Sequence, residues 1–524
     1  MRILWSSNSP FVATGYGTQT ATAARRLKDM GHDIALLAFY GLEGSRVDWG
    51  DIPIYPNNPR DWGVKHSPMF YQDWKADILI TLVDAWVLGD LHSEMNWVPW
   101  MPVDHDPIAP AIVGVLQKST GLVKPIAMSK FGQQQLANND IDSYYIPHSV
   151  NCEAFIPNLE WRKEGRERYS WSDKFVVGCV GTNHDERKNW VASLKAIRDF
   201  SKMHPGEVIF YMHTNPLDER GINLLRLRQD LEIEDITKFP SQADMTVGIP
   251  TDTMARMYNA LDVFLLPTKG EGFGIPIMEA QACGVPVITT KCTAQEELME
   301  GGWFIEQLFP VWTKQSSWQF DCHHEEIVEH LESAYQAKRD GSMINHQTLS
   351  RSKALEYDEA LIYKDYWPPV LEDIEKRIKM PKNLEGIQEW RRAFIPRTCL
   401  PRKVLDIGCG VKASYAPALK HLGDYTGVDN RFKGDEHIDG MLLVKAEADT
   451  LPFQDREFGF VWMSELLEHV DNPEKVLAEA KRVGKHGVCL FSTPMNSFFK
   501  LDPGHRVVKL PYATVQTGDG CIVW

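Results

Sequence analysis

Apolar runs of strand length alternate with polar or helical stretches through the first part of the chain. The first unit consists of a predicted strand at 3–5, a loop with Gly15 and Gly17, and a predicted helix at 18–30. Further apolar runs follow before residue 160, at 32–39, 78–83, 97–103, 124–128 and 144–147. This alternation predicts a parallel sheet with helices on both faces.

A second alternating series follows a polar stretch at 157–165, which we interpret as a connector. Its apolar runs lie at 175–181, 207–213, 263–267 and 285–289. They predict a second doubly wound domain. From 327 to about 375 the apolar residues recur at helical spacing, and we expect Pro368 and Pro369 to kink or end this helical run.

A third strand and glycine loop begin at Lys403, after a stretch at 380–400 whose prolines and charges are typical of a linker. The pattern therefore predicts an α/β chain with two doubly wound, Rossmann-like domains and a third, abbreviated Rossmann-like domain. The predicted segments are 1–160, 161–345, a helical segment at 346–379, the linker, and 401–524.

Composition narrows the class of protein. The chain has 524 residues, of which 43% are hydrophobic and 24% charged, values typical of a folded globular protein with several cores. Acidic residues outnumber basic ones by 71 to 56, which gives a net charge of −15. The electrostatic field of this negative charge repels the phosphate backbone of a nucleic acid, so the composition argues against nucleic acid as a partner.

No membrane span or export signal is visible. The longest apolar stretch, 78–88, is broken by Asp84 and is much shorter than the roughly 20 residues of a spanning helix. We expect no transmembrane segment, while peripheral contact with a membrane stays open. The nine cysteines include no CxxC pair and are odd in number, which is typical of reduced thiols. Together with a polar N-terminus, these features predict a cytoplasmic protein.

The most informative stretch is 265–288, LLPTKGEGFGIPIMEAQACGVPVI. It predicts a strand, a glycine loop, a helix and a strand. The glycines leave backbone N–H groups uncovered, and a helix with Pro276 in its first turn attracts phosphate through its free donors and its dipole. The glycines alone are also compatible with an ordinary turn of an α/β domain. The loop residues that we assign to a ligand are Gly272, Phe273 and Gly274.

Two glutamates complete the pattern: Glu271 in the loop and Glu279 on the predicted helix. Each carboxylate can accept paired hydrogen bonds from hydroxyls, which suits an elongated, polyhydroxylated ligand. The combination E-G-F-G, P-x-x-E-A and C-G-V-P-V resembles the two-glutamate motif of the retaining family 4 glycosyltransferases, which have the GT-B fold. By this resemblance Glu279 holds the ribose of a nucleotide sugar, and Glu271 holds the hydroxyls of the donor sugar.

The resemblance extends over residues 1 to about 378. It implies that 1–160 bind the acceptor, that 161–345 bind the nucleotide sugar, and that the helices at 346–379 pack back on the GT-B fold. The stretch 180–189, VGTNHDERKN, resembles the family's phosphate-binding loop.

In that loop the family has an arginine where this chain has Thr182, whereas Lys188 keeps the lysine position and Arg187 stands beside it. The resemblance implies that both cations contact the donor diphosphate. Without it, Arg187 and Lys188 would be interpreted as a solvated charge pair.

On the acceptor side, the resemblance implies that Gly15 and Gly17 face the cleft between the domains. The strand at 97–103 runs into Asp104 and His105 at the edge of that cleft. Both are candidates for positioning the acceptor, and His105 is also a candidate proton acceptor. The alternative for His105 is a purely structural role.

The implied reaction is glycosyl transfer with retention of anomeric configuration, by front-face attack in which the departing diphosphate acts as base while Lys188 stabilises its charge. No metal is needed on this interpretation. Cys322, His323 and His324 form either a cluster of soft metal ligands or ordinary surface. UDP and GDP carriers both fit these motifs.

The third segment has its own motifs. The stretch 403–410, KVLDIGCG, predicts a strand that runs into a glycine turn, and 425–429, YTGVD, predicts a strand that ends in an acid. This pair suits a nucleoside-bearing ligand, because Asp429 can accept both ribose hydroxyls. A dinucleotide-binding fold is one interpretation. Together with EADTLPF at 447–453 and LLEHV at 466–470, however, the motifs resemble class I S-adenosylmethionine-dependent methyltransferases.

This second resemblance implies S-adenosylmethionine as a cofactor, with Glu468 and His469 near the methyl-transfer cleft. It assigns the methionine moiety to Asp406, Gly408 and Gly410. It assigns the ribose to Asp429, and the adenine to Glu447 and Ala448. Only 30 residues follow Pro494, whereas this fold usually closes with a helix and an antiparallel strand pair. We therefore expect the end of this domain to be missing or abbreviated.

The leading hypothesis is a bifunctional enzyme that transfers a sugar from a nucleotide sugar and methylates the glycan. One alternative keeps the methyltransferase segment as an inert docking module. Another treats the first two domains as a nucleotide-sugar epimerase of the same architecture. A glycan, a protein hydroxyl and a modified nucleic-acid base are alternative acceptors, although the charge lowers the last. The sequence leaves the oligomeric state open.

Overall fold

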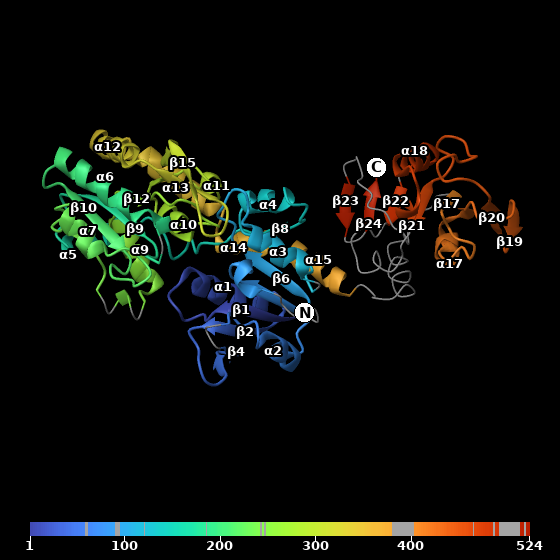
Figure 1. Ribbon diagram of the computed structural model, residues 1–524, viewed down its shortest axis with the longest axis horizontal. Coiled ribbons are helices and arrows are strands. Elements are labelled where there is room, and N and C mark those ends of the chain that lie inside the picture. The colour runs from blue at the N-terminus through green and yellow to red at the C-terminus, as the bar shows by residue number, and fades with distance from the viewer. Residues whose placement is uncertain are drawn as a thin grey trace. The chain divides into compact units, whose positions relative to one another are not determined.

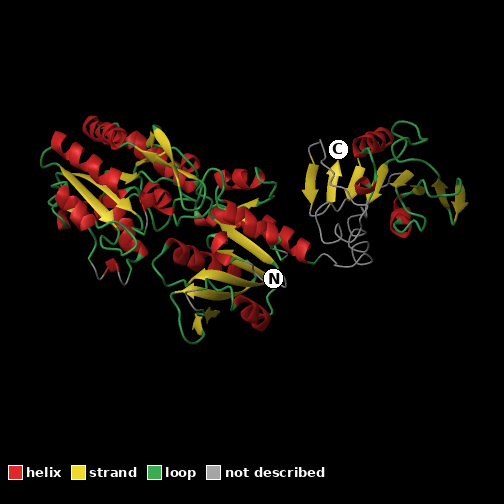
Figure 2. Cartoon of the chain, viewed as in Figure 1, coloured by secondary structure: helices red, strands yellow, loops and turns green. Residues whose placement is uncertain are grey.

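The computed structural model places the chain in two compact units, Met1–Leu371 and Glu372–Trp524. Figures 1 and 2 show their helices and strands. The predicted linker at 380–400 lies outside the described residues. The described residues are 1–57, 61–89, 95–119, 121–184, 186–241, 244–245, 248–379, 403–464, 466–485, 488–491, 514–517 and 520–523.

The first unit begins with an eight-stranded sheet in the order β3-β4-β2-β1-β5-β6-β7-β8. Its neighbouring strands are parallel except for β3 and β4. We call the part of the chain built on this sheet, 1–145, the N-lobe. The strands are β1 (Arg2–Asn8), β2 (Asp33–Tyr40), β3 (Val47–Trp49), β4 (Ile52–Pro56), β5 (Ile78–Leu82), β6 (Trp97–Met101), β7 (Ile126–Ala127) and β8 (Tyr144–Tyr145). The helices are α1 (Gly15–Asp29), α2 (Ser67–Trp74), α3 (Pro110–Lys118) and α4 (Lys130–Ala137), with a short 3₁₀ turn η1 (Ala85–Leu88).

A six-stranded parallel sheet in the order β11-β10-β9-β12-β13-β14 follows. We call 159–340 the C-lobe. The two sheets confirm the predicted α/β fold with two doubly wound domains, since their central strands, such as β5 and β12, are apolar runs buried along their whole length. The strands are β9 (Phe175–Val180), β10 (Val208–His213), β11 (Thr237–Lys238), β12 (Val263–Leu266), β13 (Val287–Thr290) and β14 (Trp303–Ile305). The helices are α5 (Leu159–Arg168), η2 (Glu186–Lys188), α6 (Trp190–Met203), α7 (Leu224–Asp230), α9 (Thr251–Ala260), α10 (Ile275–Ala282), α11 (Gln295–Leu298) and α12 (His324–Asp340).

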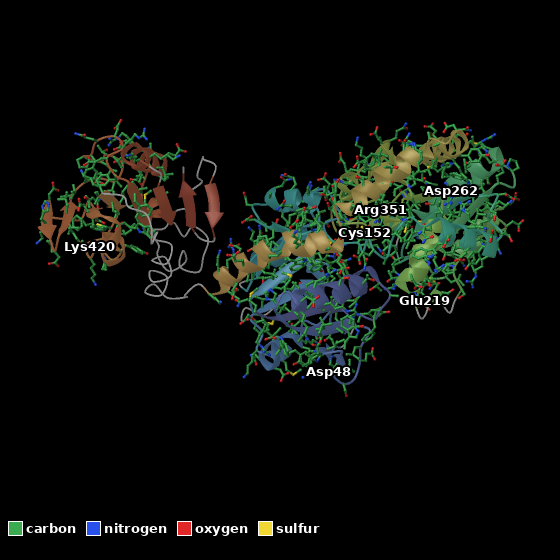
Figure 3. All side chains as sticks on the ribbon, turned by 180° about the vertical axis from the view of Figure 1, so that it is seen from behind. Asp48, Cys152, Glu219, Asp262, Arg351 and Lys420 are labelled. Carbon is green, nitrogen blue, oxygen red and sulfur yellow. The ribbon has the colours of Figure 1, made fainter. Side chains whose placement is uncertain are left out.

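The sequence analysis was wrong about the connector at 157–165, because α5 begins at Leu159. Asn158 caps this helix by accepting hydrogen bonds from two backbone N–H groups. Arg162 and Arg166 of α5 both pair with the buried carboxylate of Asp262, which Figure 3 labels, with Arg166 Nη2 2.6 Å from Oδ2. Two arginines, one in this polar segment and one just after it, therefore anchor the helix to the C-lobe.

Three helices, α13 (Met343–Leu355), α14 (Glu359–Asp365) and α15 (Trp367–Ile378), follow the C-lobe. Pro368 and Pro369 do end the preceding helix, but they also open α15, where a missing N–H and a fixed φ cost little. Trp367 is fully buried and its ring lies 6.1 Å from that of Trp5 and 5.4 Å from that of Trp100, both in the N-lobe. The end of this helical segment is thus packed on the first sheet.

Arg351 of α13 fixes the segment that joins the lobes (Figure 3). Its guanidinium donates to the backbone oxygens of Cys152 and Phe155 at 2.9 and 2.7 Å, and to that of Ala282 at 2.6 Å. One side chain therefore ties the crossover between the lobes to the end of α10.

The Glu372–Trp524 unit contains an eight-stranded sheet in the order β19-β20-β18-β17-β21-β22-β24-β23. The strand pair that we expected to be missing or abbreviated is present as β24 and β23, four residues each and antiparallel. Residues 492–513, which precede it, lie outside the described part of the chain. The strands are β17 (Lys403–Ile407), β18 (Asp424–Val428), β19 (Glu436–Ile438), β20 (Met441–Val444), β21 (Phe460–Ser464), β22 (Val488–Phe491), β23 (Thr514–Thr517) and β24 (Gly520–Val523). The helices are α17 (Ala416–Leu419) and α18 (Pro473–Val483), with 3₁₀ turns η3 (Lys420–Leu422) and η4 (Leu467–His469).

Candidate functional site

The glycine loop between β12 and α10 lies directly against the N-lobe. A Cβ atom added at Gly270 would lie 2.4 Å from the backbone oxygen of Asp104, and one added at Gly272 would lie 2.1 Å from Cβ of Pro102. Because both distances are far below van der Waals contact, only glycine allows this approach. Gly274 has a φ of 120°, which also favours glycine.

Helix α10 begins directly after Gly274, with Pro276 in its first turn and no side chain capping its first N–H groups. These donors and the helix dipole favour an anion at this end. Phe273 is 3% exposed, and its ring meets that of His148 edge-on at 5.3 Å. Phe273 therefore packs against the segment that joins the lobes.

The buried carboxylate of Glu271 is held between two cations. Arg187 Nη1 donates to Oε2 at 2.9 Å, and Lys188 Nζ donates to Oε1. Burial alone would raise the pKa of Glu271, but the two cations outweigh it and lower the pKa to about 2. Burial lowers the pKa of Lys188, and Glu271 opposes that effect. The structure thus joins three residues that the sequence analysis had assigned to separate contacts with the donor.

Glu279 on α10 has a different environment. In the described part of the chain its hydrogen-bond partner is Tyr258, whose hydroxyl donates to Oε2 at 2.8 Å. Burial raises the pKa of Glu279 to about 7, against the opposing effect of that hydrogen bond. Its charge is not compensated by an ion pair with another described residue, so a ligand hydroxyl that donates to it would relieve the loss of solvation.

The loop after β6 brings Asp104 and His105 to the glycine loop. Asp104 Oδ1 lies 2.7 Å from His105 Nδ1, and Asp104 Oδ2 lies 3.8 Å from Nε of Arg187. His105 Nε2 lies 3.0 Å from Oγ1 of Thr313, and the side chain is 3% exposed. Both ring nitrogens therefore have protein partners. A role as proton acceptor would require one of these hydrogen bonds to break.

Gly15 and Gly17 have distinct surroundings. A Cβ atom at Gly15 would lie 3.3 Å from Cδ1 of Ile275, the first residue of α10, so Gly15 faces the C-lobe. A Cβ atom at Gly17 would lie 2.1 Å from the backbone oxygen of Val12, and the N–H of Gly17 donates to Oγ1 of Thr14. Gly17 thus allows the close backbone approach in the turn at the start of α1.

Two polar residues beside Asp104, Tyr16 and Asp84, were not predicted from the sequence. The Tyr16 hydroxyl lies 3.5 Å from Oδ2 of Asp84. Burial and the nearby carboxylate of Asp104 raise the pKa of Asp84 to about 6, while Arg187 opposes the shift. A signal was available, because Asp84 follows an apolar strand as Asp104 does, but the sequence pattern was interpreted only as a break in the apolar stretch 78–88.

In the second unit, the glycine turn after β17 lies next to Asp429. Gly408 and Gly410 have φ of 73° and 71°, and the N–H of Gly410 donates to Oδ2 of Asp429 at 2.9 Å. Arg431 donates two hydrogen bonds to the same carboxylate, from Nε to Oδ1 at 2.8 Å and from Nη2 to Oδ2 at 2.9 Å. Burial would raise the pKa of Asp429, but these donors outweigh it and lower the pKa.

The other residues assigned to the cofactor surround this turn. Tyr425 donates to the buried Asp406 at 2.7 Å, and burial raises the pKa of Asp406 to about 7. Glu447 accepts from Nδ2 of Asn430 at 3.1 Å, whereas Ala448 packs against the apolar core. The glycine turn beside Asp429 fits a nucleoside-bearing cofactor. Arg431, however, already pairs with the carboxylate of Asp429.

The described residues contain no group of three or more His, Cys, Asp or Glu side chains arranged to hold a metal ion. Of the candidate metal ligands Cys322, His323 and His324, Cys322 is buried, and His324 Nε2 lies 3.1 Å from Oδ2 of Asp199. Within the same described ranges, no helix has both the length and the apolar character needed to cross a membrane.

Comparison with known families agrees with both motifs. Residues 174–311 match the family described as glycosyl transferases group 1, and residues 405–491 match the family described as methyltransferase domain. The chain therefore contains a glycosyltransferase group 1 domain and a methyltransferase domain, which confirms the two resemblances. Both families are transferases.

Individual relatives match over short stretches. The GDP-mannose-dependent alpha-(1-6)-phosphatidylinositol monomannoside mannosyltransferase of Mycolicibacterium smegmatis is 30% identical over 165 residues, 30% of this chain and 41% of that protein. The lipopolysaccharide core biosynthesis mannosyltransferase LpsB of Rhizobium meliloti is 51% identical over 170 residues, 31% of this chain and 44% of that protein. The chain thus spans less than half the length of these relatives.

Solved structures show the fold of the first unit. Sucrose-phosphate synthase from Thermosynechococcus elongatus superposes with a TM-score of 0.57 at 14% identity, over 71% of this chain and 98% of that chain. Anabaena Alr3699/HepE, solved in complex with UDP and glucose, gives a TM-score of 0.53 at 15% identity, over 72% and 99%. The two lobes therefore have the GT-B fold that the sequence predicts.

Proposed function

We propose that the Met1–Leu371 unit transfers a sugar from a nucleotide sugar to a hydroxyl-bearing acceptor with retention of configuration. The observation that carries this proposal is the contact of Arg187 and Lys188 with the buried carboxylate of Glu271 in the glycine loop, from which Arg187 also reaches Asp104 of the N-lobe. A donor bound there would have its charged diphosphate on the C-lobe and its sugar directed at the N-lobe.

GDP-mannose is the donor that we propose. The two relatives compared above are named mannosyltransferases, and one of them is named GDP-mannose-dependent. UDP is the competing carrier, because HepE was solved with UDP and glucose. The names of those mannosyltransferases refer to phosphatidylinositol mannoside and lipopolysaccharide, which supports a glycan or glycolipid as acceptor. Six cysteines are buried free thiols, in keeping with the proposed cytoplasmic site: Cys152, Cys179, Cys283, Cys292, Cys322 and Cys409.

The proposed chemistry needs no covalent enzyme intermediate. The carboxylate of Glu271 is paired with Arg187 and Lys188, so it is not free to attack the donor sugar. The acceptor oxygen forms a bond to the anomeric carbon on the face from which the diphosphate oxygen departs. The acceptor proton passes to that departing oxygen. Lys188, released in part from Glu271, and the N-terminus of α10 stabilise the charge that develops on the diphosphate.

Donor turnover tests this proposal. The full chain is incubated with GDP-mannose or UDP-glucose and host glycolipid extract, and the released nucleotide and the product are identified by mass spectrometry and NMR. We expect GDP release that depends on acceptor, and an α-linked product. Formation of an epimer without acceptor would favour the epimerase alternative, and no turnover of either donor would contradict the proposal.

For the second unit we propose binding of S-adenosylmethionine, which supplies an electrophilic methyl group when bound, and methylation of the glycan. Asp429 would accept hydrogen bonds from the ribose, and Gly408 and Gly410 would allow the cofactor to approach the backbone. Isothermal titration should show binding that is lost in Asp429→Ala. No heat with the unaltered chain would contradict this part of the proposal.

A second candidate for this unit is a docking module without turnover. The observation that favours it is the bidentate pair between Arg431 and Asp429, which occupies both carboxylate oxygens. Turnover of S-adenosylmethionine after glycosylation would exclude the docking module, whereas binding without turnover would favour it.

A further inference from the structure

Tyr16 and Asp84 lie at the same edge of the N-lobe sheet as Asp104. Strand β5 pairs with β1 on one side and with β6 on the other, and all three strands are parallel. Asp84 follows β5, Asp104 follows β6, and Tyr16 lies at the start of α1, which follows β1. The carboxyl ends of adjacent parallel strands are where α/β folds place groups that contact ligands.

The Asp84 carboxylate keeps capacity for a ligand. It is partly exposed, and besides the backbone of Asp84 itself its hydrogen-bond partner in the described part of the chain is the Tyr16 hydroxyl, at a long 3.5 Å. Among the same described residues it forms no ion pair within 4.0 Å with a Lys, Arg or His, although the charge of Arg187 acts on it from further away. Burial and Asp84 also raise the pKa of Tyr16 well above its usual value, so its hydroxyl stays protonated and can donate.

The charges around this pair disfavour a further anion. The carboxylates of Asp84, Asp104 and Glu271 face two cations, Arg187 and Lys188, and both cations already pair with Glu271. A donor diphosphate would add negative charge on the C-lobe side. A phosphate on the acceptor next to Asp84 would therefore be repelled, whereas hydroxyls could donate to the carboxylate.

We propose that Asp84 and Tyr16 position the attacking end of the acceptor and select an acceptor whose neighbouring groups are uncharged hydroxyls. The proposal rests on the proposed glycosyl transfer and deepens it by naming the acceptor class. Asp84 accepts a hydrogen bond from an acceptor hydroxyl, and Tyr16 holds the carboxylate in place. Both are positioning residues, because the proton of the attacking hydroxyl leaves with the diphosphate.

The test measures binding of defined probes to the full chain saturated with GDP. The neutral probes are methyl α-mannoside and myo-inositol, and their anionic counterparts are mannose 6-phosphate and inositol 1-phosphate. In saturation-transfer NMR we expect signals from the neutral probes only. Asp84→Asn should weaken the neutral probes about tenfold, as loss of a hydrogen bond to a charged group does, and should let the phosphorylated probes bind.

Tyr16→Phe provides a second variant, expected to weaken the neutral probes with the selectivity kept. Asp173→Asn, an exposed site in the C-lobe with the same change of charge, is the matched control and should bind like the unaltered chain. The inference is overturned if phosphorylated probes bind the unaltered chain as well as neutral ones, if no neutral probe binds, or if Asp84→Asn changes nothing. Failure of GDP itself to bind would instead contradict the proposed donor, and failure of both GDP and UDP would contradict the proposed function.

Discussion

At the scale of single residues, the candidate site depends on how carboxylates are compensated. Glu271 and Glu279 lie in one motif, yet the pKa of Glu271 is lowered to about 2 by two cations and that of Glu279 is raised to about 7 by burial. The motif gives their spacing. It does not give their partners, since Arg187 and Lys188 come from a loop more than eighty positions earlier in the chain.

Glu271→Gln should separate binding from turnover. Loss of the carboxylate releases Lys188 and Arg187 for the diphosphate, so we expect GDP to bind at least as tightly as before. Transfer should fall by a factor of about 100 or more, because the donor sugar loses its acceptor of hydroxyl hydrogen bonds. Isothermal titration and nucleotide release measure the two effects. Turnover close to that of the unaltered chain would contradict the role of Glu271.

The pKa of Glu279 predicts a dependence of stability on pH. The folded state keeps its proton up to about pH 7, whereas the unfolded state loses it near the ordinary value of 4.5. Because the folded state binds more protons in this window, the free energy of unfolding falls as pH rises through it. Glu279→Gln has no group that titrates in this window, so it should raise the free energy of unfolding at pH 8 by at most about 3 kcal/mol. At pH 4 we expect no such gain.

Thermal unfolding of both proteins at the two pH values measures this difference. An equal effect of Glu279→Gln at pH 4 and pH 8 would show that the carboxylate is not desolvated in the folded state.

Arg431 allows a corresponding test in the second unit. Its side chain is 63% exposed, so its pair with Asp429 is worth a few tenths to 1 kcal/mol. Arg431→Ala should free the carboxylate for the ribose and tighten binding of S-adenosylmethionine about two- to fivefold in isothermal titration. Arg431→Lys, which keeps the charge without the planar fork, serves as comparison. Weaker binding in Arg431→Ala would indicate that Arg431 itself contacts the cofactor.

At the scale of helices and strands, the sequence predicted most of the parallel strands because each is a short apolar run. Strand β5 was expected at 78–83 and spans Ile78–Leu82. The hairpin of β15 (Leu308–Trp312) and β16 (Trp318–Cys322) was missed, since a proline interrupts the apolar run of β15 and β16 mixes apolar with polar residues. Yet this hairpin supports the site, because Thr313 at its turn contacts His105.

The close approach of the glycine loop to the N-lobe makes a prediction at this scale. In Gly272→Ala the new Cβ would lie 2.1 Å from Cβ of Pro102, so the loop or the lobe must shift. We expect a loss of about 1–3 kcal/mol in stability and weaker GDP binding. Gly114→Ala in α3 is the matched control, because nothing lies within 4 Å of its added Cβ and alanine favours a helix. Unchanged unfolding of Gly272→Ala would contradict the close contact.

At the scale of the whole molecule, two units with separate sheets carry two transferase domains. The α/β class, both glycine turns and the GT-B fold could be predicted from short motifs, because those motifs are local in sequence. The position of Asp84 after an apolar run did not by itself place it beside Asp104, since that proximity depends on β5 lying between β1 and β6, and strand order is not local. The domain boundaries and the site residues stay predictions.

The most direct test of the account is titration of GDP into the full chain and into Glu279→Ala, with Asp173→Asn as control and S-adenosylmethionine titrated in parallel. If the glycine loop and α10 hold the nucleotide, GDP binding weakens at least about tenfold in Glu279→Ala, while the control and the binding of S-adenosylmethionine are unchanged. Equal GDP binding by all three proteins, or no binding by the unaltered chain, would contradict it.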